Sequence, residues 1–493
     1  MLISNARVGD ALLDLRIRDG VITELGVLGG EGLDLEGRYV IPGLWDEHVH
    51  FTQWSLARRR LDLQSATSAA EAAQLVAVAA SQITTPDAPR RLFGGHGHFG
   101  GHGHVEPPVL VGAGFRDALW PDIPTVNLLD AAAPDIPVVL VSGDVHSCWL
   151  NSAALKRFGF AGRTDGLLRE DESFAVVRQL DSVAPEQIEG AIADAAAAAA
   201  ARGIVGITEL EFGWNIDAWQ SRIAAGVDTL RVDVGFYADD LQRAIDADYR
   251  SGQRLNDLLT VGPLKMITDG SLNTRTAYCV DPYPDVHDQP HGMLTVQPDE
   301  LVGYLTRATR HGLRAAVHAI GDDANRVALD AFETVGCRGR IEHAQLLRRE
   351  DLSRFAELGI VASVQPEHAM DDRDVADRYW HGRTDRAFAL RSLIDAGAEV
   401  RFGSDAPVAA LDPWVSIAAA VSRTKDGREP WHPEQSITVD EAIAASVRSS
   451  IGVGQPADLV VLEHDPRTVS AEELRTMPVA ATMLGGRFTH QTI

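Results

Sequence analysis

The stretch Tyr39-Val40-Ile41-Pro42-Gly43-Leu44-Trp45-Asp46-Glu47-His48-Val49-His50 decides how the rest of the chain is interpreted. An apolar run typical of a buried strand ends here in two histidines at positions i and i+2. Side chains alternate between the two faces of a strand, so this spacing sends both imidazoles to one face. Two neutral imidazoles at a strand end form half of a transition-metal site. For this motif alone, an incidental pair of surface or core histidines is the competing interpretation.

Strand-like runs alternate with helical patterns through most of the chain, which is typical of parallel βα units. The runs cover residues 39–51, 203–212, 229–236, 258–269, 314–321, 340–346, 360–368 and 399–408. There are eight such runs, and eight is the number of strands that a (β/α)8 barrel requires. We therefore expect an α/β fold built on a TIM-like barrel, with an open doubly wound sheet as the alternative. In a barrel, the polar residues that end these runs would meet at one mouth.

Short β-like segments also lie at both ends of the chain. They cover residues 2–8, 13–18, 21–25, 38–41, 457–462 and 479–484. Tight turns at Asp19-Gly20 and Gly485-Gly486 favour hairpins there. We expect residues 1–44 and 441–493 to form one small β-sandwich domain beside a barrel of residues 45–440.

The connection after the first barrel strand, at about residues 52–202, is far longer than a βα loop needs. It predicts an inserted subdomain or lid over the barrel mouth. Within it, residues 94–104 read GGHGHFGGHGH. Either this patch is a metal-loading or substrate-gating loop, or it is a glycine-rich loop with incidental histidines.

Composition excludes several classes of partner. Lys and Arg number 45 against 70 Asp and Glu, and the net charge of −25 argues against nucleic acid and anionic membranes. Three widely spaced cysteines indicate a reducing compartment. The chain has no long apolar run of a signal peptide or membrane span. We expect a cytoplasmic protein that acts on a small molecule; assembly into a homo-oligomer stays open.

Further residues able to bind metal end later strand-like runs. They are Lys265, His318, His343 and Asp405. A free ammonium is poorly placed beside a cation, but reaction with CO2 would convert Lys265 into an anionic carbamate able to bridge two metals. The carbamate, Asp405 and a bridging hydroxide would offset most of the charge of two divalent ions. The small positive remainder suits a site that stabilises a developing oxyanion.

Eight segments match the pattern of a known family, in family order and across almost the whole chain. They are residues 42–50, 143–155, 265–271, 317–322, 341–345, 363–368, 403–408 and 457–462. On these segments the chain resembles the metal-dependent amidohydrolase superfamily, in the branch of amidohydrolase family 3 that includes N-substituted formamide deformylase. The match is specific for the branch and weak for the substrate.

The resemblance implies a centre of two divalent metals. The implied ligands are His48, His50 and Asp405 for the more buried ion, carboxylated Lys265 as the bridge, and His318 and His343 for the second ion. Zinc is the expected metal, although the oxygen ligands would also accept Mn, Fe or Ni. Asp405 would also act as general acid and base. The implied reaction is cleavage of an amide, N-formyl or cyclic amide C–N bond by metal-activated hydroxide.

Other functions remain open on the same residues. The same metal site would also suit a deaminase, an esterase or an isomerase, and a non-catalytic barrel scaffold is the alternative from another class. On the substrate side we expect contributions from His146, His368 and Arg275. Glu209 and Glu211 either contact a cationic substrate group or form salt bridges inside the barrel rim.

Overall fold

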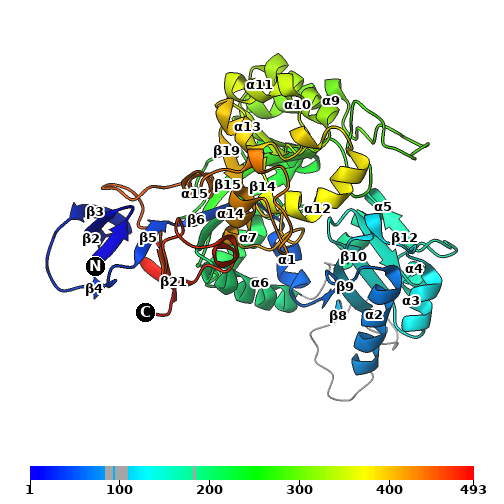
Figure 1. Ribbon diagram of the computed structural model, residues 1–493, viewed down its shortest axis with the longest axis horizontal. Helices are drawn as coiled ribbons and strands as arrows, with labels where there is room; N and C mark the ends of the chain where they lie inside the picture. Colours follow the sequence, from blue (N-terminus) through cyan, green and yellow to red (C-terminus); the bar gives the residue numbers. More distant parts are fainter. Residues whose placement is uncertain (84–92, 95–108, 181–184) are drawn as a thin grey trace.

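The computed structural model describes residues 1–83, 93–94, 109–180 and 185–493 (Figure 1). Apart from Gly94, the glycine- and histidine-rich patch at 94–104 lies outside the described residues. At the centre is a sheet of eight parallel strands in the order β6-β13-β14-β15-β16-β17-β18-β19. Their bounds are β6 (Leu44–Val49), β13 (Ile204–Glu209), β14 (Arg231–Tyr237), β15 (Leu259–Ile267), β16 (Ala315–Ala319), β17 (Gly339–His343), β18 (Val361–Val364) and β19 (Val400–Phe402).

Backbone hydrogen bonds between the carboxyl end of β6 and the segment that follows β19 close this sheet into a barrel. The Asp405 N–H donates to the carbonyl oxygen of His48 at 2.8 Å, and the His50 N–H donates to that of Ala406 at 2.8 Å. The predicted barrel is therefore confirmed. An open doubly wound sheet would leave these groups at opposite edges.

Helices cover the outside of the barrel. They include α6 (Pro185–Ala200), α7 (Ile216–Ala224), α8 (Leu241–Asp246), α9 (Pro298–Arg310), α10 (Asp322–Val335), α11 (Leu352–Leu358), α12 (Pro366–Tyr379), α13 (Leu390–Asp395), α14 (Pro413–Ser422) and α15 (Val439–Ala445). Local chemistry sets their ends. Helix α9 begins with Pro298 and two acids and ends in basic residues, which complements its dipole. Helix α10 ends at Gly336, whose φ of 66° suits a left-handed cap.

Several predicted strands extend past the observed ones, and two of them contain a break or the start of a helix. The run 39–51 is split at Gly43, whose N–H donates to Asp458 in the terminal sheet, while the N–H of Leu44 donates to Gly203 in the barrel. A Cβ at Gly43 would lie 2.5 Å from Val205, so only glycine allows this close approach. The prediction that His368 ends the seventh strand is wrong. Pro366 starts helix α12 after the shorter strand β18, and His368 lies in its first turn.

The two ends of the chain share a second sheet, as predicted. It runs β22-β21-β20-β5-β1-β2-β3, with β4 paired to β1, in one continuous hydrogen-bonded sheet. The bounds are β1 (Leu2–Val8), β2 (Ala11–Arg18), β3 (Val21–Gly26), β4 (Leu33–Asp34), β5 (Tyr39–Pro42), β20 (Leu459–Leu462), β21 (Val479–Leu484) and β22 (Arg487–Gln491). Antiparallel pairing of β5 with β20 joins the two ends. Helix α16 (Ala471–Arg475) lies between β20 and β21 in the sequence and packs on α14.

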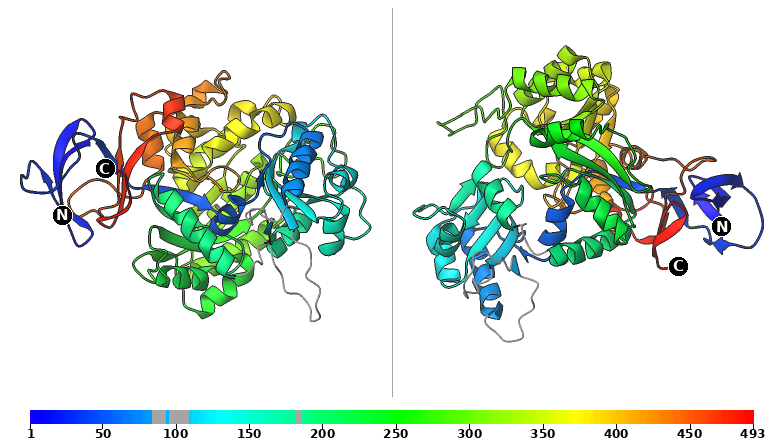
Figure 2. Two further views of the ribbon diagram at one scale, coloured as in Figure 1. Left: turned by 90° about the horizontal axis from the view of Figure 1, so that it is seen from below. Right: turned by 180° about the vertical axis from the view of Figure 1, so that it is seen from behind.

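The insertion forms a third sheet, on the side of the barrel away from the terminal sheet (Figure 2). Its strands are β7 (Leu61–Asp62), β8 (Phe93–Gly94), β9 (Val109–Phe115), β10 (Val138–Ser142), β11 (Ser147–Leu150) and β12 (Leu167–Arg169), and its helices are α2 (Ala69–Ile83), α3 (Val126–Ala132), α4 (Ser152–Arg157) and α5 (Asp171–Leu180). The insertion covers fewer residues than the predicted range 52–202. Helix α1 (Phe51–Ala57), at the start of that range, instead packs on α6 in an apolar cluster shared with barrel strands.

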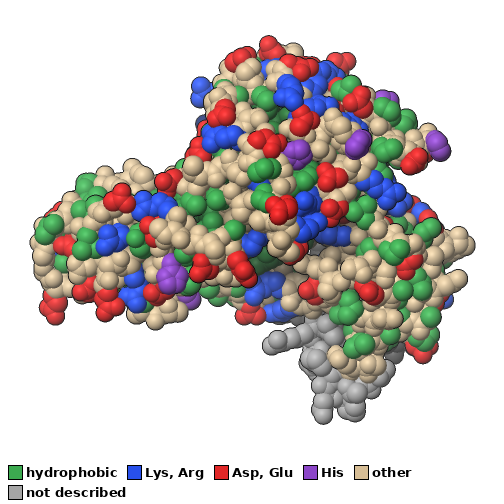
Figure 3. All heavy atoms as spheres, viewed as in Figure 1, with side chains coloured by type: hydrophobic (Ala, Val, Ile, Leu, Met, Phe, Trp, Pro, Cys, Tyr) green, Lys and Arg blue, Asp and Glu red, His purple; other side chains and the backbone are tan. Residues whose placement is uncertain are grey.

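Acidic and basic side chains are interspersed over the face shown in Figure 3. In the described part of the chain, every helix is too short or too polar to pass through a bilayer.

Candidate metal centre

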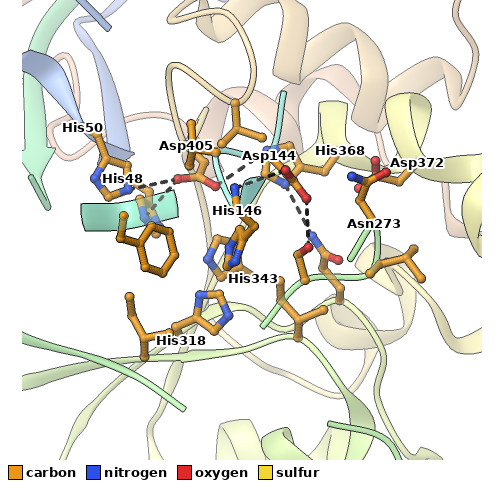
Figure 4. A pocket seen from close by; sticks show the side chains of 18 of the residues that line it. His48, His50, Asp144, His146, Asn273, His318, His343, His368, Asp372 and Asp405 are labelled. Atoms are coloured by element: carbon orange, nitrogen blue, oxygen red, sulfur yellow. Dashed lines mark hydrogen bonds and ion pairs between the residues drawn. The ribbon is translucent and has the colours of Figure 1, made fainter. Parts of the chain in front are cut away.

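The buried polar residues at the barrel mouth surround one cavity of about 60 Å³ (Figure 4). The predicted residues that line it are His48, His50, His146, Lys265, His318, His343, His368 and Asp405. Most of them end barrel strands or follow them by a few residues. Because all eight strands run the same way around the barrel, their carboxyl ends bring these side chains to one place.

Asp405 is the centre of the arrangement. Its Oδ1 atom lies 3.3 Å from Nε2 of His48 and 3.4 Å from Nε2 of His50, and its Oδ2 atom lies 4.0 Å from Nε2 of His368. Two groups of potential ligands result, one of Asp405 with His48 and His50 and one of Asp405 with His343 and His368. Asp405 itself has a φ of 58°, an uncommon conformation for a residue other than glycine. Such strain is often found at functional sites.

Three of the histidines are each held by one ring nitrogen, which leaves the other nitrogen for a metal. The anchoring contacts are His48 Nδ1 with Glu342 Oε2 at 2.7 Å, His343 Nδ1 with Gln365 Oε1 at 2.8 Å, and His318 Nε2 with Asp269 Oδ1 at 3.3 Å. The rings of His318 and His343 lie 4.4 Å apart. This places His318 beside the second group of potential ligands.

Burial and neighbouring charges together keep these ligands in the protonation states that metals need. It lowers the pKa of His48 to about 4, with a contribution from Lys265, and it lowers the pKa of His343 well below its ordinary value. Burial alone would raise the pKa of Asp405, but the neighbouring histidines, His48 foremost, bring it well below the usual range. Neutral imidazoles and an ionised carboxylate are the metal-binding forms.

Lys265 has an unusual environment for a lysine. It is 2% exposed, and its Nζ atom has no hydrogen-bond partner among the described residues. Burial lowers the pKa of the amine to about 8. A buried polar group without a partner costs free energy, so it calls for an explanation. A neutral amine is the form that reacts with CO2, and a carbamate would give this buried position a charge that a metal can balance. The residues present therefore fit a metal centre.

A network behind the site holds His48 in place. Glu342 contacts His48 and accepts a hydrogen bond from the Ser363 hydroxyl at 2.6 Å, and it pairs with Arg340. Arg340 in turn donates to Glu47 at 2.9 Å. Glu342, Ser363 and Glu47 are buried, so this network fixes the His48 ring and leaves its Nε2 atom for a metal.

Replacing Glu342 by glutamine is therefore expected to weaken metal binding by about tenfold to a hundredfold, the usual effect of losing a partner behind a metal ligand. Titration of the metal-free protein with zinc measures this. Glu350, which is exposed and paired with Arg348, supplies the control variant Glu350→Gln. Equal zinc affinity in the two variants would contradict the positioning of His48 by Glu342.

The insertion contributes side chains to the cavity. His146 and Asp144 come from this insertion, and the Ser271 hydroxyl of the barrel donates to Asp144 Oδ2 at 2.9 Å. Arg116, also from the insertion, donates to Asp371 at 2.9 Å and to Asp372 at 3.2 Å on helix α12. The cavity is thus built by the barrel and the insertion together.

Three predicted residues lie elsewhere. Arg275 is not among the described residues that line this cavity; it stacks on the Tyr379 ring at 5.4 Å and lines a neighbouring cavity. Glu209 accepts a hydrogen bond from the backbone of Phe51. Glu211 accepts one from the side chain of Gln53. These contacts favour a structural role at the barrel rim for both glutamates.

Sequence reasoning missed several residues of the site. Asp372 lies four residues after His368 on α12, so recognition of the helix would have placed both on one face. Glu342 directly precedes His343 but points behind the site. Arg116 and Glu170 have no local pattern that marks them, because they meet their partners only through the docking of the insertion.

A TIM-like barrel with a candidate metal centre at its mouth defines the class of the protein. A model of the amidohydrolase family matches residues 31–490, and the chain belongs to this family, as predicted. It is 26% identical to the putative amidohydrolase YtcJ of Bacillus subtilis, over 98% of this chain and 97% of the relative. It is 25% identical to N-substituted formamide deformylase of Arthrobacter pascens, over 99% and 94%.

Solved structures agree with this assignment. An uncharacterized metal-dependent hydrolase from Pyrococcus horikoshii OT3 has a TM-score of 0.76 and 25% identity, over 96% of this chain and 99% of that one. A 5-methylcytosine deaminase from Klebsiella pneumoniae, at 13% identity and a TM-score of 0.51, shares the fold.

Proposed function

We propose that the protein is a metal-dependent hydrolase that cleaves a C–N bond in a small amide, N-formyl compound or cyclic amide. The observation that carries the proposal is the convergence of His48, His50, His318 and His343 on Asp405 and the unpartnered Lys265. Similarity to N-substituted formamide deformylase supports the choice of bond.

The cavity residues are suited to hold two divalent ions. We assign His48, His50 and Asp405 to one ion, His318 and His343 to the other, and carboxylated Lys265 to the bridge between them. The mixed nitrogen and oxygen set favours zinc and would accept Mn, Fe or Ni. When bound, such ions supply Lewis-acid polarisation of a carbonyl and lower the pKa of water toward neutrality.

The protein's own side chains then orient the substrate and move protons. Asp405 accepts the proton of the attacking water and passes it to the leaving nitrogen. His368 has a buried Nε2 without a hydrogen-bond partner among the described residues, so it is free to hydrogen-bond the substrate carbonyl oxygen. His146 reaches the same cavity from the insertion. We keep Arg275 out of these roles because of its position beside Tyr379.

The remaining cavity wall favours an apolar group on the substrate. Phe212 lies 5.6 Å from Phe174 and 5.0 Å from Tyr237, measured between ring centroids. The His50 ring lies 5.7 Å from Phe212, so this aromatic wall begins directly beside the metal site. Such a wall provides apolar area for a substituent next to the scissile bond.

The same residues would also serve deamination, ester hydrolysis or isomerisation. The products separate these reactions, since a deaminase releases ammonia whereas an amide hydrolase with an N-substituent releases a larger amine. A non-catalytic scaffold is disfavoured, because the predicted ligands are all present and face one cavity.

Replacing His48 by alanine is expected to lower bound metal and hydrolysis together, because it removes a ligand and leaves Glu342 without its imidazole partner. Elemental analysis and assays against amides and N-formyl compounds measure both quantities. His311, an exposed residue at the end of α9, supplies the control variant His311→Ala. Normal metal content with full activity in His48→Ala would remove His48 from the ligand set.

A further inference from the structure

Backbone strain lies directly beside His146 and at Glu170, both of which belong to the insertion. Val145, just before His146, has a φ of 57°, and Glu170 has a φ of 48°. A β-branched residue in the left-handed region is a genuine outlier. The two segments are joined by a backbone hydrogen bond from the N–H of Glu170 to the carbonyl oxygen of His146 at 2.9 Å. Strain of this kind persists where surrounding contacts fix it, and it concentrates at functional sites.

Both carboxylate oxygens of Glu170 are used. Its Oε2 atom lies 2.8 Å from Nδ1 of His146. Its Oε1 atom accepts hydrogen bonds from the hydroxyls of Thr274 at 3.0 Å and Thr276 at 2.7 Å, which belong to the barrel loop after β15. Glu170 is therefore fixed from both sides, by the insertion and by the barrel.

The imidazole that Glu170 holds belongs to the cavity. The His146 ring lies 6.3 Å from the ring of His318 and packs edge-on against Phe174 at 5.4 Å. Figure 4 shows it in the middle of the site, near Asp144 and His343. Because Nδ1 is engaged by Glu170, the other ring nitrogen, Nε2, is left for a molecule in the cavity.

We propose that Glu170 is a positioning residue that keeps the His146 ring protonated on Nδ1 and turned so that Nε2 faces the substrate. This rests on the proposed function, in which His146 contacts the substrate. Glu170 has no contact with the cavity of its own, since it is not among the described residues that line it. Glu170 affects the substrate only through His146. Its hydrogen bonds to Thr274 and Thr276 make the position of His146 depend on how the insertion packs on the barrel.

A purely structural role predicts different behaviour. If Glu170 only joined the insertion to the barrel, its loss would lower the unfolding temperature and affect activity independently of His146. If it positions His146, its loss would change turnover without changing metal content, and the effect would vanish once His146 is gone. A double-mutant cycle separates the two roles.

The test compares Glu170→Gln, His146→Gln, the double variant and the control Glu172→Gln. Glu172 lies two residues away on α5, half exposed and paired with Arg163. We expect Glu170→Gln to lower kcat about tenfold to a hundredfold with a smaller change in KM, and to leave bound metal and the unfolding temperature near those of Glu172→Gln. The double variant should be no slower than His146→Gln alone. Independent, multiplicative losses would overturn the proposal, as would wild-type turnover in either single variant.

A second readout does not need activity. In protein with ¹⁵N-labelled histidine, the Nδ1–H of His146 should give a downfield proton signal that disappears in His146→Gln and Glu170→Gln and persists in Glu172→Gln. A signal that survives in Glu170→Gln would overturn the proposal. If the wild-type protein hydrolysed nothing in the substrate panel, the proposed function would fail, and this spectrum would still decide whether Glu170 holds His146.

Discussion

Replacing Asp405 by asparagine is expected to lower turnover by about a hundredfold to ten-thousandfold while the protein stays folded, the range for losing a positioned general acid and base. Asp405 lies between the two groups of potential ligands, with one oxygen facing His48 and His50 and the other facing His368. Asparagine has nearly the same shape and keeps one oxygen, but it cannot accept and return a proton. Steady-state kinetics and elemental analysis of the same preparation measure the effect.

The Asp405 variant has a matched control. Asp395 is an exposed acid at the end of α13, paired with Arg391, so Asp395→Asn makes the same chemical change away from the site. Turnover in Asp405→Asn should fall much further than its metal content. Unchanged turnover would exclude Asp405 from proton transfer, and complete loss of folded protein would point to a structural role instead.

Replacing Lys265 by methionine is expected to have opposite effects on function and on stability. Methionine fills the same buried space without a charge, so the metal-free protein should unfold with an unchanged free energy or one higher by about 1 kcal/mol. The bridge between the metals would be missing, so bound metal should fall and turnover should drop about a hundredfold or more. Urea unfolding of the metal-free protein measures its free energy of unfolding, and elemental analysis measures the bound metal.

Lys156, an exposed lysine in the last turn of α4, supplies the control Lys156→Met. It should leave turnover and metal content unchanged. A Lys265→Met protein that binds metal and turns over like the wild type would contradict the assignment of Lys265 as a bridging ligand. A large loss of stability in its metal-free form would show that the amine makes a stabilising contact before any metal binds.

Most of the barrel and of the metal site can be predicted from the sequence, because both follow from regular patterns. Apolar runs alternating with helical segments predict parallel βα units, and the residue at the end of each run is then placed at a common mouth. His318 and His343 were found in this way, each at or next to the end of its strand.

The parts that were missed depend on contacts between distant segments. The apolar run that continues to Val364 predicts a strand through His368, but Pro366 starts α12 and ends the strand before it. Arg116 meets Asp371 and Asp372 across more than 250 residues of sequence. No sequence periodicity links such distant segments. That the insertion supplies residues to the cavity can therefore be seen only in the folded structure.

The most direct test of metal-dependent C–N hydrolysis is to assay a panel of amides and N-formyl compounds against metal content, in one preparation before and after chelation. We expect about two divalent ions per chain. We also expect hydrolysis to be lost as the ions are removed and to return when zinc is restored. Hydrolysis that continues at full rate in metal-free protein, or fully loaded protein that cleaves no C–N bond in the panel, would contradict the proposed function.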